Sequence, residues 1–260
     1  MLNFKQYITL PRVDSHVHLF NYTEPIKYPF DFDKCIGFMD IEYDVDGDAV
    51  KAYDDFVKNH YDESKHILLA TAKTPEEIEK IYNNHQGIIM GFGELKLYDT
   101  YQDKKVPYKK ISILRSVCEL SSKNGGLPIF VHWEFTDDKS VRYFENVLKS
   151  YPNIPIFLCH CGMNGQNDDF AYGHCQRLHH AYSNLILDIS YKALDYFEKC
   201  PLKLYNLVLD RMTVGSDLNN KIFGPNHSEK EIILIKTKVD YLRTFIPSDQ
   251  VPTNMFTLLP

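Results

Sequence analysis

The 260-residue sequence lacks several features that would each assign it to a class of protein. No stretch reaches 18 uninterrupted apolar residues, so we expect no membrane-spanning helix. Polar residues interrupt the first dozen positions, which contain no apolar core of signal-peptide length, so we expect a cytoplasmic protein. A Gly-x-Ser-x-Gly elbow is absent, which leaves a serine-hydrolase interpretation without its nucleophile motif. Repeats, low-complexity tracts and Gly/Ser linkers are also absent, and we expect one domain over residues 1–260.

The sequence is also short of paired cysteines and of positive charge. Its six cysteines form no Cys-x-x-Cys pair, which excludes a zinc ribbon or a thioredoxin-type motif and indicates reduced, mostly buried thiols. Lys and Arg number 29 against 35 Asp and Glu, and the net charge of −6 gives no general attraction for nucleic acid. The charge therefore counts against nucleic acid as a partner, although a local basic patch stays open. No membrane partner is expected, and homo-oligomerisation stays open.

What the sequence does contain is a repeated alternation of short apolar runs and longer amphipathic stretches. Several runs are continuously apolar and β-branched, as expected of strands that are buried on both faces. The expected strands lie in 7–19, 34–41, 66–72, 87–97, 127–133, 154–161, 184–190 and 211–218. The expected helices are 48–60, 74–83, 107–123, 138–150, 168–182, 191–199 and one that begins at 228.

Eight strands that alternate with helices in about 260 residues predict an α/β fold, a (β/α)8 TIM barrel. An open doubly wound sheet is the alternative, although no Gly-rich phosphate loop supports it. Segment 20–34, between the first two strands, has no helical pattern and fits the barrel least well.

Side chains that can hold a metal ion stand at the carboxyl ends of the expected strands. In a parallel barrel these ends converge on one mouth, where active sites are built. His16 and His18 lie two residues apart and share a strand face, as do Glu94 and Lys96. The candidate ligands are His16, His18, Glu94, His132, His160 and Asp217. Imidazoles and carboxylates suit a catalytic Zn²⁺, Mn²⁺ or Fe²⁺ site with one position left open for water.

Each candidate has a purely structural explanation when it is taken alone. His132 fits a hydrogen-bonded core histidine, and Asp217 fits a turn residue or a helix cap. Glu94 fits a buried ion-pair partner of Lys96. Chance alone does not readily put four histidines and two carboxylates at strand ends together, so the joint pattern favours a shared site.

Other polar or sulfur-bearing residues receive structural roles. Because Cys159 and Cys161 flank His160, strand alternation predicts that both thiols face the helices if His160 faces the mouth. Three further histidines lie on a polar helical stretch and are expected on its solvated face: His174, His179 and His180.

The order of the motifs resembles the amidohydrolase superfamily of metal-dependent hydrolases. Val13-Asp14-Ser15-His16-Val17-His18 is similar to its first-strand metal motif, and Val214-Gly215-Ser216-Asp217 to its last-strand aspartate. Phe130-Val131-His132 and Leu158-Cys159-His160-Cys161-Gly162 resemble its fifth- and sixth-strand histidines. Gly93-Glu94-Leu95 resembles the glutamate of the TatD-like branch, whereas the Gly-Ser-Asp and His-Cys-Gly segments are closer to the amidohydrolase-2 branch.

The resemblance implies a set of roles. A first ion would be held by His16, His18 and Asp217. In a two-ion version, Glu94 bridges the ions and His132 with His160 holds the second. In a one-ion version, His132 joins the first ion, while His160 polarises the substrate or orients the water. Since the superfamily also uses a carboxylated lysine, Lys96 is an alternative bridge.

These roles predict a chemistry. We expect Zn²⁺, with Mn²⁺, Fe²⁺ or Mg²⁺ as alternatives, and a bound ion lowers the pKa of its water from 15.7 towards ~7. Asp217 would accept the proton of that water and pass it to the leaving group. The ion or His160 would stabilise charge on the attacked oxygen.

The expectation is therefore an enzyme, a metal-dependent hydrolase of a small ester, lactone, amide or phosphoester. Three alternatives stay open: a metal-dependent decarboxylase or hydratase of a small carboxylic acid, a TatD-like deoxyribonuclease, and a non-catalytic barrel. The acidic composition counts against the nuclease. The presence of all six ligand residues counts against the non-catalytic barrel.

Overall fold

The computed structural model describes residues 13–23, 25, 34–41, 47–97, 108–217 and 229–245. Within them, eight parallel strands form one sheet, and each strand pairs with the next along the chain. The strands are β1 Val13–Phe20, β2 Lys34–Met39, β3 His66–Ala70, β4 Ile89–Lys96, β5 Ile129–His132, β6 Ile156–Cys159, β7 Leu185–Ile189 and β8 Met212–Val214.

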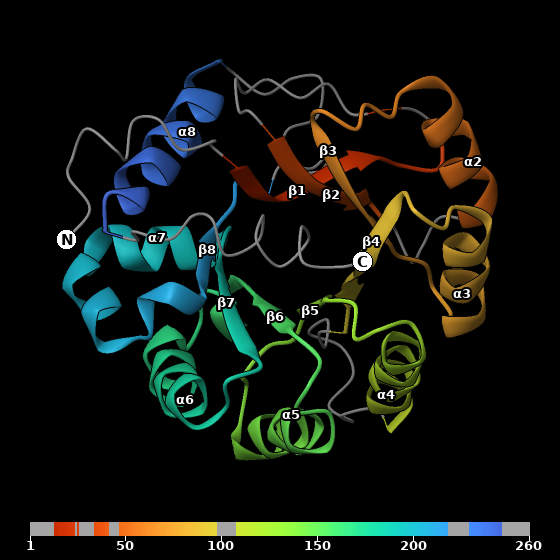
Figure 1. Cartoon of the computed structure of the whole chain (residues 1–260). Coiled ribbons are helices and arrows are strands. Elements are labelled where there is room, and N and C mark those ends of the chain that lie inside the picture. Colours follow the sequence, from red (N-terminus) through yellow and green to blue (C-terminus); the bar gives the residue numbers. More distant parts are fainter. Residues whose placement is uncertain are drawn as a thin grey trace.

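The sheet curls until its last strand lies beside its first, so that the strands form a ring (Figure 1). Two hydrogen bonds join the residues after β8 to β1. The amide of Ser216 donates to Asp14 Oδ1 at 2.8 Å, and the amide of Asp217 donates to the carbonyl oxygen of His16 at 2.9 Å. The predicted (β/α)8 TIM barrel is therefore confirmed as a nearly closed barrel, and the open doubly wound alternative is wrong.

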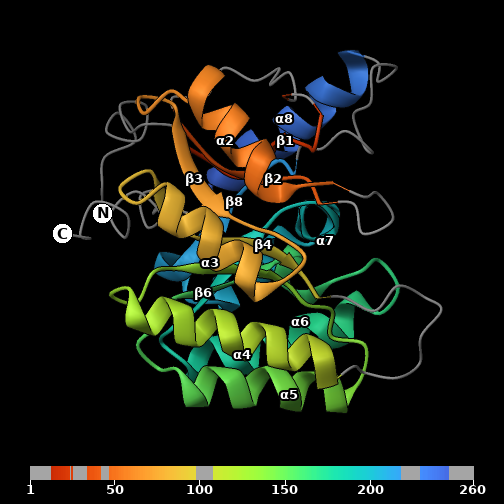
Figure 2. The same cartoon turned by 90° about the vertical axis from the view of Figure 1, so that its right-hand side faces the viewer.

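Helices surround the ring of strands (Figures 1 and 2). They are α2 Ala49–Asn59, α3 Pro75–Asn84, α4 Tyr108–Lys123, α5 Asp138–Ser150, α6 Asp168–Ala181, α7 Lys192–Lys199 and α8 Glu229–Arg243, with short 3₁₀ turns η1 His160–Gly162, η2 Pro201–Asn206 and η3 Leu209–Arg211. Each expected helix is present. Parts of five predictions lie outside the described residues: 7–12, most of 20–34, 107, 218 and 228. In the described part of the chain, no helix is long and apolar enough to cross a membrane.

Local sequence signals explain where several helices begin. The Thr74 hydroxyl accepts from the amide of Glu77, and the Glu77 carboxylate accepts from the amide of Thr74. This reciprocal pair satisfies two amides that the first turn of a helix leaves open, with Pro75 at a position that needs no amide hydrogen. Asp48 caps α2 in the same way by accepting from the amide of Lys51.

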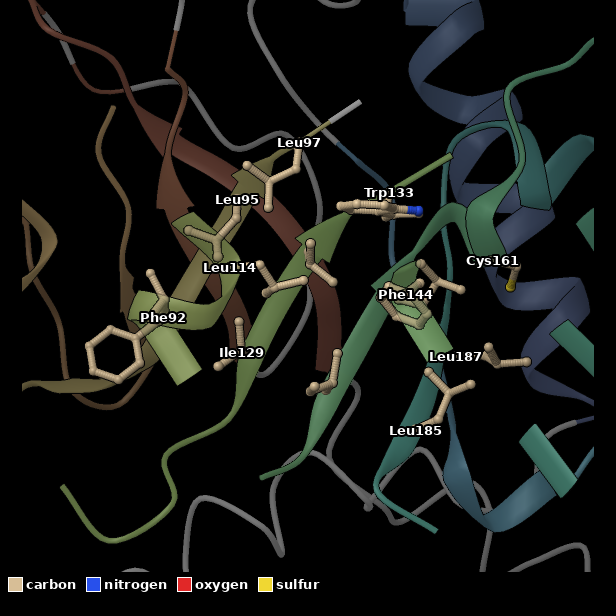
Figure 3. Packing of buried hydrophobic residues seen from close by; sticks show 14 of the residues in the cluster. Phe92, Leu95, Leu97, Leu114, Ile129, Trp133, Phe144, Cys161, Leu185 and Leu187 are labelled. Atoms are coloured by element: carbon tan, nitrogen blue, oxygen red, sulfur yellow. The ribbon is translucent and has the colours of Figure 1, made fainter. Parts of the chain in front are cut away.

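Alternate residues of the strands build two separate apolar layers. One layer packs against the helices, and Figure 3 shows part of it, with Phe92, Leu95, Ile129 and Leu187 on the strands. The other fills the inside of the barrel with Val13, Ile36, Phe38, Ile67, Leu69, Phe130, Phe157, Cys159 and Ile186. The inner layer is a packed plug, so the space for chemistry is restricted to the mouth above it.

Cys159 belongs to the inner layer, which corrects one expectation. The prediction that both Cys159 and Cys161 face the helices holds only for Cys161. β6 ends at Cys159, and His160 and Cys161 take left-handed φ values of 56° and 53°. This turn breaks the alternation, so Cys159 follows Phe157 into the barrel and His160 still reaches the mouth. Both thiols are buried, as expected.

His179 is also placed differently from the expectation, because it is fully buried and not solvated. Its Nε2 donates to the carbonyl oxygen of Arg211 at 3.1 Å, and its Nδ1 accepts from the amide of Val208 at 3.4 Å. Only a neutral imidazole can make both hydrogen bonds. Burial, helped by the charge of Arg211, lowers the pKa of His179 to about 3.

Because the pKa of His179 is lowered, we expect the folded protein to lose stability in acid. The unfolded chain binds a proton at His179 near pH 6.5 and the folded chain only near pH 3, so folding stability falls as the pH drops below 6.5. The contribution is roughly 2 kcal/mol between pH 7.5 and pH 5. Urea unfolding of the wild type and His179→Gln at both pH values should show a smaller pH dependence in the variant. Equal pH dependences would contradict the assignment.

Candidate metal centre

The six predicted ligand residues come together at the carboxyl ends of β1, β4, β5, β6 and β8. Three sets of three donor atoms drawn from them each lie within 4.8 Å of one another: His16, His160 and Asp217; His16, His18 and Glu94; and Glu94, His132 and His160. Five of the six residues are buried, and His132 is partly exposed. Side chains separated by up to 201 positions in the sequence therefore share one small volume.

The alternation of side chains along the strands directs most of these residues to the barrel mouth. Phe130 and His132 are alternate residues of β5 and share its inner face. His132 therefore lies in the site directly above the apolar plug to which Phe130 belongs. The pairing of β1 with β2 shifts register between Asp14 and Val17, and the side chain of Val17 packs in the layer against the helices. His16 and His18 point to the mouth, where each ring contacts the edge of Phe38 at about 5 Å.

Strained backbone gathers around the same mouth. Among the described residues, the non-glycine residues with positive φ are His160, Cys161, Tyr191 and Asp217, and all four follow the ends of β6, β7 or β8. Left-handed backbone is unfavourable for such residues and persists where the surrounding structure requires it, often at functional sites. Here it turns His160 and Asp217 towards the other donors.

Glu94 lies between two groups of histidines. Its Oε1 is 3.1 Å from His132 Nδ1 and 3.4 Å from His160 Nε2. Its Oε2 is 3.6 Å from His18 Nε2, on the other side. Burial alone raises the pKa of Glu94, but the hydrogen bond from His132 and the charge of His16 outweigh it and hold the pKa well below its usual range. Glu94 is thus an ionised carboxylate, and since its Oε1 also lies 3.7 Å from His16 Nε2, it approaches histidines of both groups.

Asp217 completes the opposite side of the site. Its Oδ1 is 3.3 Å from Nε2 of His16 and 3.3 Å from Nε2 of His18. Burial raises the pKa of Asp217, but the close approach of His16 and His18 and the charge of His16 and His160 more than reverse this, so its pKa lies far below the usual value. A second ionised carboxylate therefore faces the same volume as Glu94.

This donor set suits a divalent cation. Nε2 of His16 is buried and has no hydrogen bond of normal geometry among the described residues, although the Asp217 and Glu94 carboxylates lie 3.3 and 3.7 Å away. Burial lowers the pKa of His16, yet the adjacent Asp188 carboxylate raises it well above normal. The volume is therefore one that draws in positive charge. Imidazole and carboxylate donors are the ligands of zinc and similar ions.

Lys96 does not pair with Glu94 in the way the structural explanation of Glu94 required. Its ammonium lies 2.7 Å from Asp40 Oδ1, just after the end of β2, which is separated from β4 by β3 in the sheet. The same oxygen is 3.7 Å from His18 Nδ1. The positive charge of Lys96 is thus partly neutralised beside the site, which leaves the Glu94 carboxylate to the histidines.

Sequence reasoning missed the residues that surround the candidate ligands. Asp188 in β7 is fully buried and accepts a 2.7 Å hydrogen bond from His16 Nδ1, and Ser190 lies 2.9 Å from His160 Nδ1. Glu134 lies 3.7 Å from His132 Nε2. The one available signal was the carboxylate within the apolar run of β7, because a buried charge requires a partner.

Gly215 fixes how closely β8 approaches the site. A Cβ atom at this position would lie 2.5 Å from the Cβ of His16 and 2.6 Å from its amide nitrogen. We expect Gly215→Ala to displace His16, to lower the free energy of unfolding by about 1–3 kcal/mol and to weaken zinc binding. The control is Gly173→Ala in α6. A Cβ atom there would meet no neighbouring group within 4 Å, and alanine should stabilise the helix. Equal zinc affinities in the two variants would contradict this role for Gly215.

No family model and no curated protein matches the sequence. The structure is similar to an amidohydrolase from Burkholderia multivorans with bound zinc, with a TM-score of 0.62 at 13% identity over 96% of this chain and 100% of the other. A TatD homologue from Escherichia coli gives 0.60 at 13% identity over 94% and 97%. A probable 2-pyrone-4,6-dicarboxylic acid hydrolase from Acinetobacter baumannii with citric acid bound gives 0.58 at 14% identity over 96% and 100%. The chain has the fold of these proteins. The fold that the motif resemblance implied is thereby confirmed.

Proposed function

We propose that the protein is a metal-dependent hydrolase of the amidohydrolase type, which acts as one domain on a small-molecule substrate. The observation that carries the proposal is the meeting of four imidazoles and two ionised carboxylates in one buried volume at the barrel mouth. The fold supports it, because parallel barrels build their active sites at this end.

We assign the six residues to two divalent ions, with zinc as the expected metal. His16, His18 and Asp217 would hold the first ion, His132 and His160 would hold the second, and Glu94 would bridge them. Oε1 of Glu94 lies within 3.7 Å of His132, His160 and His16, and Oε2 lies 3.6 Å from His18. This carboxylate therefore approaches the histidines of both proposed ions, which supports the bridging role. A carboxylated Lys96 is the weaker bridge, because its carbamate would put negative charge beside the Asp40 carboxylate.

The chain's own residues divide the chemical work. A divalent ion in this site supplies Lewis acidity and makes water more acidic. Asp217 accepts the proton of the attacking water and returns it to the leaving group, since its carboxylate is ionised and borders the site. In this two-ion assignment His160 serves as a ligand, and the apolar plug around Phe38 and Phe130 closes the site from below.

The substrate panel follows from the fold relatives. One relative is named as a probable hydrolase of a 2-pyrone dicarboxylic acid, and a 2-pyrone is a cyclic ester. We therefore put lactones with carboxylate groups first, followed by simple esters, amides and phosphoesters. The protein is purified without chelators, its metal content per chain is measured, and hydrolysis is assayed before and after chelation and zinc return.

The expected result is about two ions per chain and a hydrolytic activity that disappears on chelation and returns with zinc. Release of CO₂ from carboxylic acids would favour a decarboxylase instead, and cleavage of single-stranded DNA ends would favour a TatD-like nuclease. A metal-loaded protein that is inert towards all of these compounds would favour a non-catalytic barrel.

A further inference from the structure

Asp188 is the centre of a buried hydrogen-bond network directly behind the candidate metal centre. Four side chains donate to its two carboxylate oxygens. Ser15 Oγ and Thr213 Oγ1 donate to Oδ1 at 2.9 and 3.1 Å, whereas Ser190 Oγ and His16 Nδ1 donate to Oδ2 at 2.6 and 2.7 Å. These donors occupy all the acceptor positions of a carboxylate. All of these residues are at most 1% exposed.

The direction of each hydrogen bond follows from the number of protons available. Ser190 has one hydroxyl proton, and it goes to Asp188, because two oxygens at 2.6 Å require a proton between them. The Ser190 oxygen can then only accept from His160 Nδ1, which lies 2.9 Å away. The network therefore runs from His160 through Ser190 to Asp188 and from His16 directly to Asp188, with a longer contact of 3.4 Å between His16 Nδ1 and Ser190 Oγ.

These hydrogen bonds determine the role of Nε2, the other ring nitrogen of His16 and His160. With Nδ1 donating to the network, Nε2 is the nitrogen that an ion would bind, in His16 by replacing a proton. These two Nε2 atoms face the carboxylates of the site. His16 Nε2 is 3.3 Å from Asp217 Oδ1, and His160 Nε2 is 3.4 Å from Glu94 Oε1. Hydrogen bonds of this kind fix the tautomer and orientation of metal-ligating histidines.

We propose that Asp188 and Ser190 form one shared positioning unit that presents His16 and His160 together for metal binding. The inference rests on the proposed function and extends it, since it makes one residue of β7 a determinant of both halves of the centre. His132 and His18 lie outside this unit. Nε2 of His132 lies 3.7 Å from the Glu134 carboxylate, and Nδ1 of His18 lies 3.7 Å from the Asp40 carboxylate. Asp188 and Ser190 are positioning residues that do not touch the ions themselves.

A matched pair of serine variants tests the proposal. Ser190→Ala and Ser15→Ala each remove one buried hydroxyl that donates to Asp188, but only Ser190 also receives a hydrogen bond from a candidate ligand. Cobalt(II) is titrated into the metal-free full chain, and its visible absorption reports both affinity and coordination geometry. Thermal unfolding of the metal-free proteins measures the structural cost separately.

We expect Ser190→Ala to weaken cobalt binding about 10–100-fold and to change the cobalt spectrum. Ser15→Ala should change the affinity less than about threefold at a similar loss of thermal stability. Asp188→Asn should weaken binding at least as much as Ser190→Ala, because it disturbs both histidines. If Asp188→Asn does not fold, the two serine variants still decide the question.

Two results would overturn the proposal. One is a Ser190→Ala protein that binds cobalt as Ser15→Ala does, and the other is a folded Asp188→Asn protein with wild-type affinity and spectrum. A wild-type protein that binds no cobalt at all would instead contradict the proposed metal-dependent function. The failure of the inference and the failure of that function are therefore distinguishable.

Discussion

Replacing Asp217 with asparagine is expected to lower turnover about 10²–10⁴-fold while metal ions still bind. The amide keeps an oxygen where Asp217 Oδ1 now lies, 3.3 Å from His16 and His18, but it cannot take up a proton at neutral pH. Turnover on the best substrate of the panel and metal content per chain are measured on the same preparations.

The control for this substitution is Asp240→Asn on the exposed surface of α8, which should behave as the wild type. A variant that loses its metal together with its activity would show that Asp217 acts mainly as a ligand. Wild-type turnover in Asp217→Asn would remove this residue from the mechanism altogether.

Replacing His16 with alanine is expected to abolish binding of at least one ion per chain. His16 belongs to two of the three donor sets at the mouth, and its Nε2 faces both carboxylates. The substitution also removes a donor from the buried carboxylate of Asp188, which should lower the free energy of unfolding by roughly 1–3 kcal/mol. Metal analysis and urea unfolding of the metal-free protein measure the two effects.

The exposed His60 at the end of α2 provides the matched histidine-to-alanine control, with no expected change in metal content. Retention of the wild-type number of ions by His16→Ala would contradict the ligand assignment. A loss of ions without any loss of stability would contradict the support that His16 gives to Asp188.

The barrel could be predicted from the sequence because its pattern is local. Runs such as 66–72 and 184–190 are apolar on both faces, and only a parallel sheet covered by helices buries such strands completely. The site followed from the same pattern, since polar residues at the ends of parallel strands share one mouth. No knowledge of side-chain contacts was needed for either inference.

The details that failed depend on contacts between distant segments. His179 lies in a polar helical stretch, and its burial results from Val208 and Arg211, about 30 positions further along the chain. Lys96 takes Asp40 as partner, from a strand 56 positions earlier. The left-handed turn at His160 reverses the alternation on which the orientation of Cys159 was based. Periodicity contains no information on such pairings.

Asp188 shows the same limit within the site itself. A single carboxylate in an apolar strand indicates a buried charge. Nothing in the neighbouring sequence shows that its partner is His16, which lies 172 positions away. The candidate ligands could be found because they share one edge of the sheet. Their supporting partners could not, because each contact joins two strands through side chains alone.

The most direct test of the proposed metal centre is an anomalous-scattering map, at the zinc edge, of crystals grown with zinc. A two-ion centre predicts two peaks at the barrel mouth, one of them about 2 Å from Nε2 of His16 and a carboxylate oxygen of Asp217. The absence of any peak among the six side chains, in crystals that diffract well enough to resolve them, would contradict the claim that they share a cation.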